Sequence, residues 1–475
     1  MFKRVTIWFL SIAALAPASL GASAILAGDD DDRPARPNIV LIVTDDQRWD
    51  TLSQMPGVDR LLADRGLTFS NAFVTNPLCC PSRSAILTGT HSHSTGVYTN
   101  EGAHGLAAFD DRSTIATWLD DAGYETAFIG KYFNGSWPAA YVPPGWDRWA
   151  AFRNGDDLYY DYDLLVDGRP RAYGTGADSY STDVLARYAE RFIRMTPDDD
   201  PLFMMVSTFA PHSPRTPPPG SVAGADADAD AATASAWQPG PNLPEIDVSD
   251  KPAYVQALDP FGPQHLRQAR RTWAEQVAAL RSVDEMVTGV VRALRETGRL
   301  TDTLIVFTSD NGIAVGEHGW TYKLAPYEES IRVPLVMRYD PLTDGGRTDA
   351  LAVNVDIAPT IAALAGVRAP GIEGRSMLPI LEGETAGVRK DFLIEHVRYR
   401  GDRGLPDPPT YCAVRTHDRL FVHYATGEEE LYDLDRDPWE LENLATVARR
   451  REELTALRQR TKQLCRPKPP GFTWR

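Results

Sequence analysis

Residues 37–46 read Pro-Asn-Ile-Val-Leu-Ile-Val-Thr-Asp-Asp, an apolar run that ends in polar residues. The run from Ile39 to Val43 has no polar side chain, whereas a strand with one solvated face would alternate apolar and polar residues. An uninterrupted run of this kind indicates a strand that is buried on both faces. Such strands are typical of a mostly parallel sheet with helices on each side.

Similar segments recur along the chain and alternate with helical patterns. Three further buried strands are predicted: Thr126 to Ile129, Leu202 to Ser207 and Leu304 to Thr308. Two amphipathic helices are predicted, each followed by a glycine that favours a helix end: Ser113 to Asp121 before Gly123, and Gln264 to Thr297 before Gly298. The alternation predicts an α/β fold, with a mostly parallel sheet sandwiched by helices.

The pattern changes after Ile380. Three short strands and one helix are predicted there: Tyr411 to Arg415, Leu420 to Tyr424, Glu430 to Tyr432, and a helix from about Thr446 to Leu464. We therefore expect an α/β domain over residues 37–380 and a smaller α+β subdomain, an antiparallel sheet plus one helix, over 381–475. Residues 217–252 are rich in Pro, Ala, Asp and Gly, and they are either one wall of a site or an inert surface insertion.

Composition excludes several classes of protein. The chain of 475 residues carries 65 acidic and 49 basic side chains, a net charge of −16, which disfavours binding to nucleic acid phosphates. Its hydrophobic fraction of 43% is that of a well-packed globular protein. The chain has four cysteines, too few for a fold built on disulfides, so the fold must rest on hydrophobic burial.

The first 24 residues have the pattern of a secretory signal peptide. Lys3 and Arg4 precede an apolar stretch from Val5 to Leu15, and Ala22-Ser23-Ala24 offers a cleavage site. Residues 25–36 then form an acidic spacer. These features predict a secreted protein, extracellular or periplasmic, with no stable membrane association. An uncleaved membrane anchor is the alternative interpretation.

Polar residues follow the predicted strands where parallel α/β sheets bind their ligands, beyond the carboxyl ends of the strands. Five segments qualify: Thr44-Asp45-Asp46, Cys79-Cys80-Pro81-Ser82-Arg83, Gly130-Lys131, Pro211-His212 and Ser309-Asp310-Asn311-Gly312. Two of them together supply oxygen donors that predict a Ca²⁺ or Mg²⁺ site: Asp45, Asp46, Asp310 and Asn311. For either pair alone, capping of a turn is the competing interpretation.

Cys79 is predicted to lie at the N-terminus of a helix. Pro81 favours the first turn of a helix, and Arg83 lies one turn after Cys79 and can approach the same point. Exposed N–H groups and the helix dipole at this end stabilise negative charge. The alternative is that Cys79 and Cys80 are small core residues or disulfide partners.

The segment from Cys79 to Gly89, Cys-Cys-Pro-Ser-Arg-Ser-Ala-Ile-Leu-Thr-Gly, resembles the signature of the formylglycine-dependent sulfatases. The resemblance covers almost the whole chain after the signal peptide. It implies an alkaline-phosphatase-like α/β core, with residues 37–380 as the catalytic domain, and a bound calcium ion. It also implies that a formylglycine-generating maturation enzyme converts Cys79 to formylglycine before export.

The same resemblance implies a role for each polar residue. The metal ligands would be Asp45, Asp46, Asp310 and Asn311, together with the formylglycine made from Cys79. The sulfate charge would be neutralised by Arg83, Lys131 and Lys323, and His212 would protonate the leaving alcohol. His93 is expected either to polarise the formylglycine hydrate or to be a solvent-exposed loop residue.

Within the family the chain looks most like the branch of N-acetylglucosamine-6-sulfatases and heparan 6-O-sulfatases. This likeness rests on three segments: residues 77–83, 130–134 and 141–146. Two positions depart from the pattern. Phe133 stands where many sulfatases have histidine, which leaves Asn134 or His93 as the partner of the formylglycine hydroxyl. Asn311 stands where the branch tends to have histidine.

The expected substrate is a sulfated sugar, possibly of the N-acetylglucosamine 6-sulfate type, or an aryl sulfate. The alternatives are a phosphodiesterase or phosphonate monoester hydrolase of the same superfamily, and a non-catalytic secreted protein that binds sulfated glycans. Cys412 and Cys465 are expected to form a disulfide in the exported protein, which leaves Cys80 as a buried thiol, and His318 is expected to be structural. Three tryptophans are expected either to stack on a sugar or to anchor the core: Trp137, Trp146 and Trp320.

Overall fold

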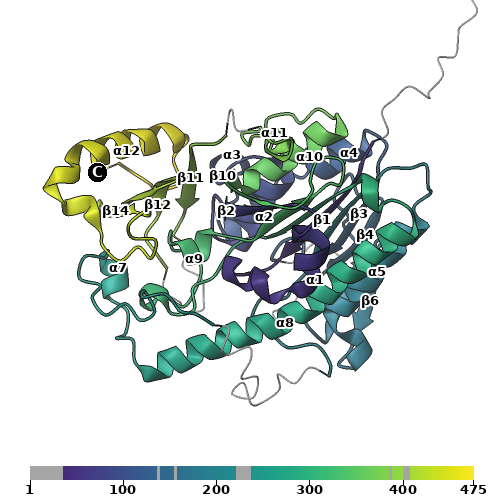
Figure 1. The fold of residues 1–475 in the computed structure, drawn as a ribbon, viewed down its shortest axis with the longest axis horizontal. Helices are drawn as coiled ribbons and strands as arrows, with labels where there is room; N and C mark the ends of the chain where they lie inside the picture. Colours follow the sequence, from purple (N-terminus) through teal and green to yellow (C-terminus); the bar gives the residue numbers. More distant parts are fainter. Residues whose placement is uncertain are drawn as a thin grey trace, which may run out of the picture. The chain divides into compact units, whose positions relative to one another are not determined.

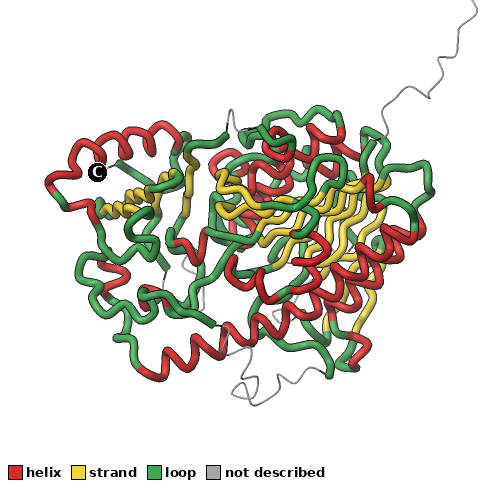
Figure 2. The backbone as a smooth tube through the Cα atoms, viewed as in Figure 1, coloured by secondary structure: helices red, strands yellow, loops and turns green. Residues whose placement is uncertain are grey.

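The predicted strands form the centre of one large sheet with helices on both faces (Figures 1 and 2). The computed structural model describes residues 36–135, 140–153, 158–220, 237–384, 388–398 and 407–474. The predicted signal peptide, the acidic spacer apart from Arg36, and residues 221–236 of the predicted insertion lie outside the described residues.

The large sheet has ten strands in the order β10-β2-β9-β8-β1-β7-β3-β4-β5-β6. Their bounds are β1 Asn38–Thr44, β2 Leu67–Phe73, β3 Glu125–Gly130, β4 Arg148–Phe152, β5 Tyr162–Val166, β6 Arg169–Tyr173, β7 Leu202–Ser207, β8 Thr303–Ser309, β9 Leu335–Arg338 and β10 Arg347–Val353. The central strand β1 pairs in parallel with both β7 and β8. Antiparallel pairing is confined to β9 and to the β4-β5-β6 edge. The mostly parallel sheet is therefore confirmed.

The helices connect the strands and cover the sheet. They are α1 Pro56–Val58, α2 Cys79–Thr88, α3 Ser92–Thr95, α4 Ile115–Asp120, α5 Ser181–Met195, α7 Ala253–Gln256, α8 Pro263–Glu296, α9 Glu328–Ile331, α10 Ile357–Ala365, α11 Leu378–Leu381 and α12 Arg451–Leu464. The two predicted helices correspond to α4 and α8. Figure 1 shows the long helix α8 running beside α5.

The residues of β1 show why the strand must be apolar throughout. Ile39, Leu41 and Val43 belong to the core that includes residues of α2, α4 and α10. Val40 and Ile42 point to the other face and belong to the core with α5 and α8. All five side chains are fully buried, so a polar residue at any of these positions would lose its contact with water.

The C-terminal region forms a second, antiparallel sheet with one helix. Its strands, in the order β11-β12-β13-β14, are Asp391–His396, Tyr411–Thr416, Arg419–Tyr424 and Glu429–Asp433. Strand β11 was not predicted. Helix α12 begins at Arg451 rather than near Thr446, because the Asn443 side chain accepts a hydrogen bond from Ala445 N and starts a separate 3-10 turn. The domain boundary at residue 380 stays a prediction.

A disulfide joins Cys412 on β12 to Cys465 at the end of α12. The pairing expected from the sequence is therefore present, and Cys79 and Cys80 are free and buried. Within the described residues, the structure contains no helix long and apolar enough to cross a bilayer.

We expect the Cys412→Ala/Cys465→Ala variant to have a lower free energy of unfolding than the wild type, by roughly 2–4 kcal/mol. The disulfide spans 53 residues, and its loss frees a long loop in the unfolded chain. Urea unfolding of both proteins measures the difference. A reducing agent should bring the wild type to the stability of the variant and leave the variant unchanged; equal stability without reductant would contradict the prediction.

Candidate active site

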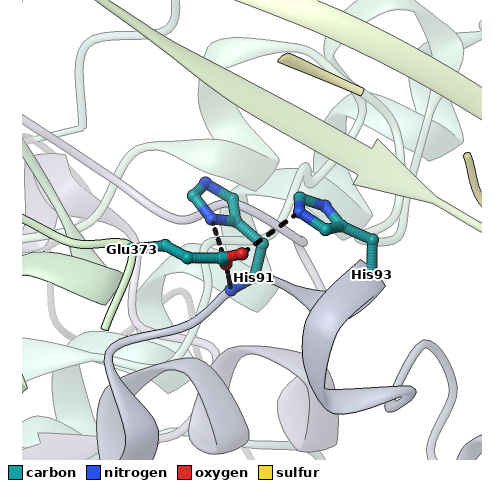
Figure 3. Close-up of side chains that lie close together, drawn as sticks. All are labelled: His91, His93 and Glu373. Atoms are coloured by element: carbon teal, nitrogen blue, oxygen red, sulfur yellow. Dashed lines mark hydrogen bonds and ion pairs between the residues drawn. The ribbon is translucent and has the colours of Figure 1, made fainter. Parts of the chain in front are cut away.

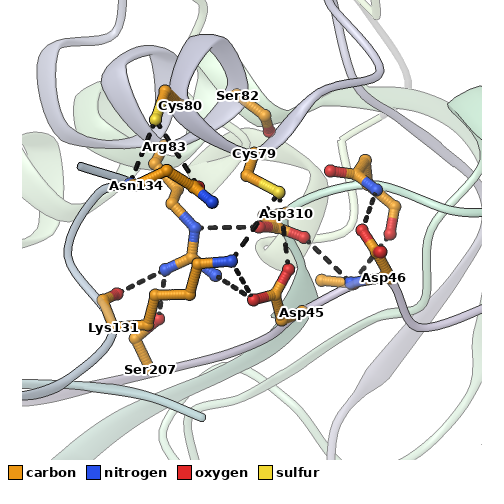
Figure 4. A network of polar contacts seen from close by, with 12 residues as sticks. Asp45, Asp46, Cys79, Cys80, Ser82, Arg83, Lys131, Asn134, Ser207 and Asp310 are labelled. Atoms are coloured by element: carbon orange, nitrogen blue, oxygen red, sulfur yellow. Dashed lines mark hydrogen bonds and ion pairs between the residues drawn. The ribbon is translucent and has the colours of Figure 1, made fainter. Parts of the chain in front are cut away.

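Three strands of the large sheet bring their carboxyl ends to one place (Figure 4). Asp45 and Asp46 follow β1, and Asp310 follows β8, whose Ser309 is in register with Thr44. Lys131 follows β3, whose Gly130 is in register with Ser207 of β7. Parallel pairing thus gathers residues that are hundreds of positions apart, as the rule for ligand sites in α/β sheets requires.

Cys79 is the first residue of α2, directly after the extended Leu78. Its Sγ lies 2.9 Å from Lys323 Nζ, 3.6 Å from Asp45 Oδ1 and 3.8 Å from Lys131 Nζ. Burial raises the pKa of the Cys79 thiol to about 12, although the two lysines oppose the shift. The thiol is therefore protonated near neutral pH and is a poor nucleophile as it stands.

Four oxygen-bearing side chains form a buried cluster suited to a hard cation. Asp45, Asp46 and Asp310 have no more than 3% exposure, and Asp46 N donates to Asp310 Oδ1 at 3.1 Å. Asn311 Nδ2 donates to Asp46 Oδ1 at 2.6 Å, while Asn311 Oδ1 is buried with no hydrogen-bond partner among the described residues. Carboxylate and amide oxygens are the donors that Ca²⁺ and Mg²⁺ prefer, so these residues fit the expected metal.

Three buried cations balance the three aspartates. Arg83 Nε donates to Asp310 Oδ2 at 2.8 Å, and Arg83 Nη1 donates to Ser207 Oγ at 2.6 Å. Lys323 Nζ donates to Asp46 Oδ1 at 2.6 Å. The third cation, Lys131, donates to Asp45. Burial is the largest single influence and opposes the charge on each lysine, but the nearby anionic groups together outweigh it and raise the pKa of both; Asp45 contributes most for Lys131 and Asp46 for Lys323.

His212 lies at the edge of this cluster, with 21% of its side chain exposed. Its Nε2 is 3.6 Å from Asp46 Oδ2, and its Nδ1 lies 2.7 Å from the Ser213 carbonyl oxygen. A carbonyl only accepts, so Nδ1 carries the hydrogen and Nε2 faces the site. Burial lowers the pKa of His212 to about 3, with Asp46 opposing the shift, so the ligand-free imidazole is neutral. A bound anion would raise this pKa.

The structure does not bring His93 to the cluster. His93 lies beyond the opposite end of α2, where it contacts Glu395 and Glu373. Asn134, the other candidate for the missing histidine, contacts Cys80 instead: its N donates to Cys80 Sγ at 3.2 Å. Phe133 packs against Phe109, with ring centroids 4.6 Å apart. The polar groups nearest Cys79 Sγ are therefore the two lysines and Asp45.

Trp146 and Trp320 are anchors of the core, which is one of the two environments expected for them. Trp320 is fully buried, and its Nε1 donates to the Lys323 carbonyl at 2.9 Å, which fixes the segment that carries Lys323. Trp146 stacks on Phe203 with centroids 5.5 Å apart. Trp137 lies outside the described residues.

The described part of the predicted insertion holds the loop that precedes Lys323. Glu245 lies 2.6 Å from His318 Nδ1, and Asn242 accepts from His318 N at 2.9 Å through its carbonyl. His318 is buried and packs on Tyr327, which agrees with the structural role expected for it. Residues 237–252 therefore hold the loop that carries His318, rather than forming an inert insertion.

Two site residues were missed by the sequence analysis. Ser207 is the last residue of β7 and orients Arg83, but a serine at a strand end carries no distinct signal. Arg215 lies three residues after His212 with a left-handed backbone (φ 62°), and the Asp46 carboxylate acts on its charge. Its Nε is buried without a hydrogen-bond partner among the described residues. The available signal for Arg215 was a cation three residues after Pro211-His212 in an acidic chain.

Comparisons with known proteins agree with this geometry. The sulfatase family model matches residues 37–367, and the model for the C-terminal part of N-sulphoglucosamine sulphohydrolase matches residues 316–466. An extracellular sulfatase SULF-1 homologue of Drosophila melanogaster is 34% identical over 379 residues, which are 76% of this chain but only 33% of that relative. Human N-acetylglucosamine-6-sulfatase is 32% identical over 476 residues, covering 90% of this chain and 83% of the relative.

Among solved structures, one described as a complex with its substrate D-glucosamine-2-N,6-O-disulfate superposes with a TM-score of 0.74 at 28% identity. It covers 90% of this chain and 97% of its own. The fold is that of the alkaline-phosphatase-like sulfatases, and the chain belongs to the sulfatase family. The protein is an enzyme, a sulfuric ester hydrolase.

We expect Ca²⁺ to stabilise the wild type by about 2.7 kcal/mol at a concentration one hundred times its Kd. Asp45→Asn and Asp310→Asn should abolish this gain, because each removes a charged oxygen donor from the buried cluster. Calorimetric titration and thermal unfolding with Ca²⁺ measure both effects. Asp344→Asn is the matched control, since that side chain is 88% exposed. Unchanged Ca²⁺ affinity in both site variants would contradict the assignment.

Proposed function

We propose that this sulfatase removes sulfate from sulfated sugars after oxidation of Cys79 to formylglycine, with Ca²⁺ as its metal. The observation that carries the proposal is the position of Cys79 Sγ, at the N-terminus of α2 and next to two lysines and a metal-ligand candidate. The formylglycine hydrate supplies two hydroxyl groups, one to attack sulfur and the other to expel sulfate. The metal supplies a Lewis acid that offsets the charge of the sulfate oxygens.

The residues of the chain supply position and charge. Lys131 and Lys323 both approach Sγ, so each can neutralise an oxygen of a sulfate group bound there. Arg83 is held between Asp310 and Ser207 and adds a third fixed positive charge. Donors fixed in a buried site need not reorient during reaction, and loss of one such donor typically costs about 10²- to 10³-fold in rate.

His212 is the proposed acid for the leaving alcohol. Its Nε2 faces Asp46 at the edge of the buried cluster, where the alcohol part of a substrate would enter. The neutral imidazole must gain a proton before it acts, and the negative charge of a bound sulfate ester favours that gain. Nδ1 is already fixed by the Ser213 carbonyl, so the proton to be transferred is at Nε2.

The proposal predicts the mass of the peptide that contains residue 79. In protein from the native host, this peptide should be lighter than the cysteine form by the difference between H₂S and one oxygen atom. Cys79→Ala should abolish sulfate release from an aryl sulfate while the protein stays folded and binds Ca²⁺. Cys80→Ala is the matched control, because Cys80 contacts Asn134 and Asn100 rather than Lys323. An active Cys79→Ala enzyme, or an unmodified thiol in active protein, would refute the nucleophile.

For the substrate we propose a glucosamine 6-sulfate. The support is the relative named N-acetylglucosamine-6-sulfatase and the structural neighbour described as a complex with D-glucosamine-2-N,6-O-disulfate. A panel of singly sulfated sugars should show the highest kcat/KM for the 6-sulfate of N-acetylglucosamine. An aryl phosphate diester in the same panel tests the alternative of a phosphodiesterase. Faster turnover of that diester, or a preference for a 2- or 4-sulfate, would overturn the assignment.

We also propose that the enzyme is exported after cleavage of residues 1–24. The support is the charge and hydropathy pattern of that segment and the disulfide between Cys412 and Cys465, which is typical of oxidising compartments. Sequencing the N-terminus of the protein recovered outside the cytoplasm tests this. A mature protein that retains Lys3 and Arg4 would show that the segment is not cleaved.

A further inference from the structure

Two histidines and a glutamate meet just after the C-terminal end of α2 (Figure 3). His91 Nδ1 lies 3.0 Å from Glu373 Oε2, and His93 Nε2 lies 3.5 Å from Glu373 Oε1. The two imidazoles stack with centroids 5.2 Å apart. One nitrogen of each ring therefore faces a different oxygen of the same carboxylate, and Figure 3 shows the carboxylate between the rings.

This cluster is separate from the active site. Cys79 is the first residue of α2, and Gly89 ends the helix with a left-handed backbone (φ 68°) before the chain reaches His91. A helix of ten residues is about 15 Å long, so its two ends serve different sites. The cluster therefore needs an explanation other than sulfate chemistry.

A second carboxylate fixes the orientation of His93. Glu395 on β11 is fully buried, and its Oε1 lies 3.1 Å from His93 Nδ1. The main-chain N of His93 also donates to Glu395 Oε1, at 3.0 Å. If Nδ1 donates to Glu395, the neutral ring has an acceptor at Nε2, and this acceptor faces the acceptor Oε1 of Glu373. Only a proton or a metal cation between them makes the contact favourable.

The surroundings favour a positive charge at this point. His93 lies against two carboxylates, those of Glu373 and Glu395, so two negative charges face its ring. Ser94 Oγ donates to Glu373 Oε1 at 2.5 Å, which holds the carboxylate in place. In metal sites, a carboxylate on the far nitrogen of a histidine is the usual orienting partner. Glu395 stands in that position.

We propose that His91 Nδ1, His93 Nε2 and Glu373 bind one Zn²⁺ ion. Two histidines and one carboxylate are a donor set that zinc uses with an open fourth position. One possible ligand atom from each of the three residues lies within 4.8 Å of the other two, so small side-chain rotations bring the three residues around one ion. The side chains of His91 and Glu373 are 12% and 32% exposed, which leaves the fourth position to water.

The ion would join three segments of the chain behind the helix that carries Cys79. Glu373 N and Gly374 N already donate to the carbonyl of Gly89, at 2.9 and 3.0 Å. Zinc bound to His91, His93 and Glu373 would add a second connection between the segment after α2 and the segment around Glu373. Glu395, which contacts His93, would connect both segments to β11. The expected effect is therefore on the stability of this end of α2, independent of the proposed substrate.

The test is a titration of the Ca²⁺-saturated full chain with Zn²⁺, followed by calorimetry and by the thermal midpoint. We expect one Zn²⁺ per chain and a higher midpoint for the wild type. His91→Asn should lose both effects, because asparagine can still donate to Glu373 but lacks the imidazole ligand. His417→Asn is the matched control, since His417 is exposed, contacts Asp349 and Asn71, and should leave Zn²⁺ binding unchanged.

Two further measurements make the result independent of the folding of one variant. Co²⁺ in place of Zn²⁺ should give the wild type the visible absorption of a tetrahedral site. Glu395→Gln should weaken Zn²⁺ binding by about 10- to 100-fold, as expected for loss of an orienting partner. The site would be overturned if the wild type gave no tetrahedral Co²⁺ spectrum, or if folded His91→Asn bound Zn²⁺ as tightly as the wild type. His93 would then be a protonated histidine between two carboxylates.

Discussion

The burial of three aspartates at one edge of the large sheet is the constraint on which the site depends. Asp45, Asp46 and Asp310 are almost wholly removed from water, and a buried carboxylate is tolerated only with a positive partner. Arg83, Lys131 and Lys323 meet this requirement in the structure. The same charge balance makes the site suitable for a divalent cation and for a tetrahedral anion, which together would replace some of these pairs.

The fold brings these charges together from segments that are far apart in the sequence. The apolar strands β1 and β8 are held by cores on both faces, and their parallel register puts Thr44 beside Ser309. Asp45 follows Thr44 and Asp310 follows Ser309, so these two aspartates are neighbours in space. Helix α2 brings its N-terminus to the same point, so Cys79 lies at the end where the helix dipole favours negative charge. Stability and chemistry therefore share one set of contacts.

The sequence analysis was most successful where a pattern reflects burial. The uninterrupted apolar runs predicted β1, β3, β7 and β8, and polar residues after the strands predicted the cluster around Cys79. It was less successful where a side chain has two plausible environments. For Trp146 and Trp320 the sequence left both sugar stacking and core packing open, and both side chains are buried; for His93 it left a role at the formylglycine open, and the residue lies beyond the far end of α2. The length of α2 decides the position of His93, because it separates His93 from Cys79.

The sequence by itself determined the class of fold, the strand ends that carry chemistry and the cysteine that stands first in α2, because hydrophobic period and helix-start signals are local properties. Only the tertiary structure decided which charged groups pair, because Lys323 reaches Cys79 and Asp46 across more than 240 positions of the chain. It also decided that Glu373 and Glu395 meet His91 and His93, since those contacts join segments that no local pattern relates.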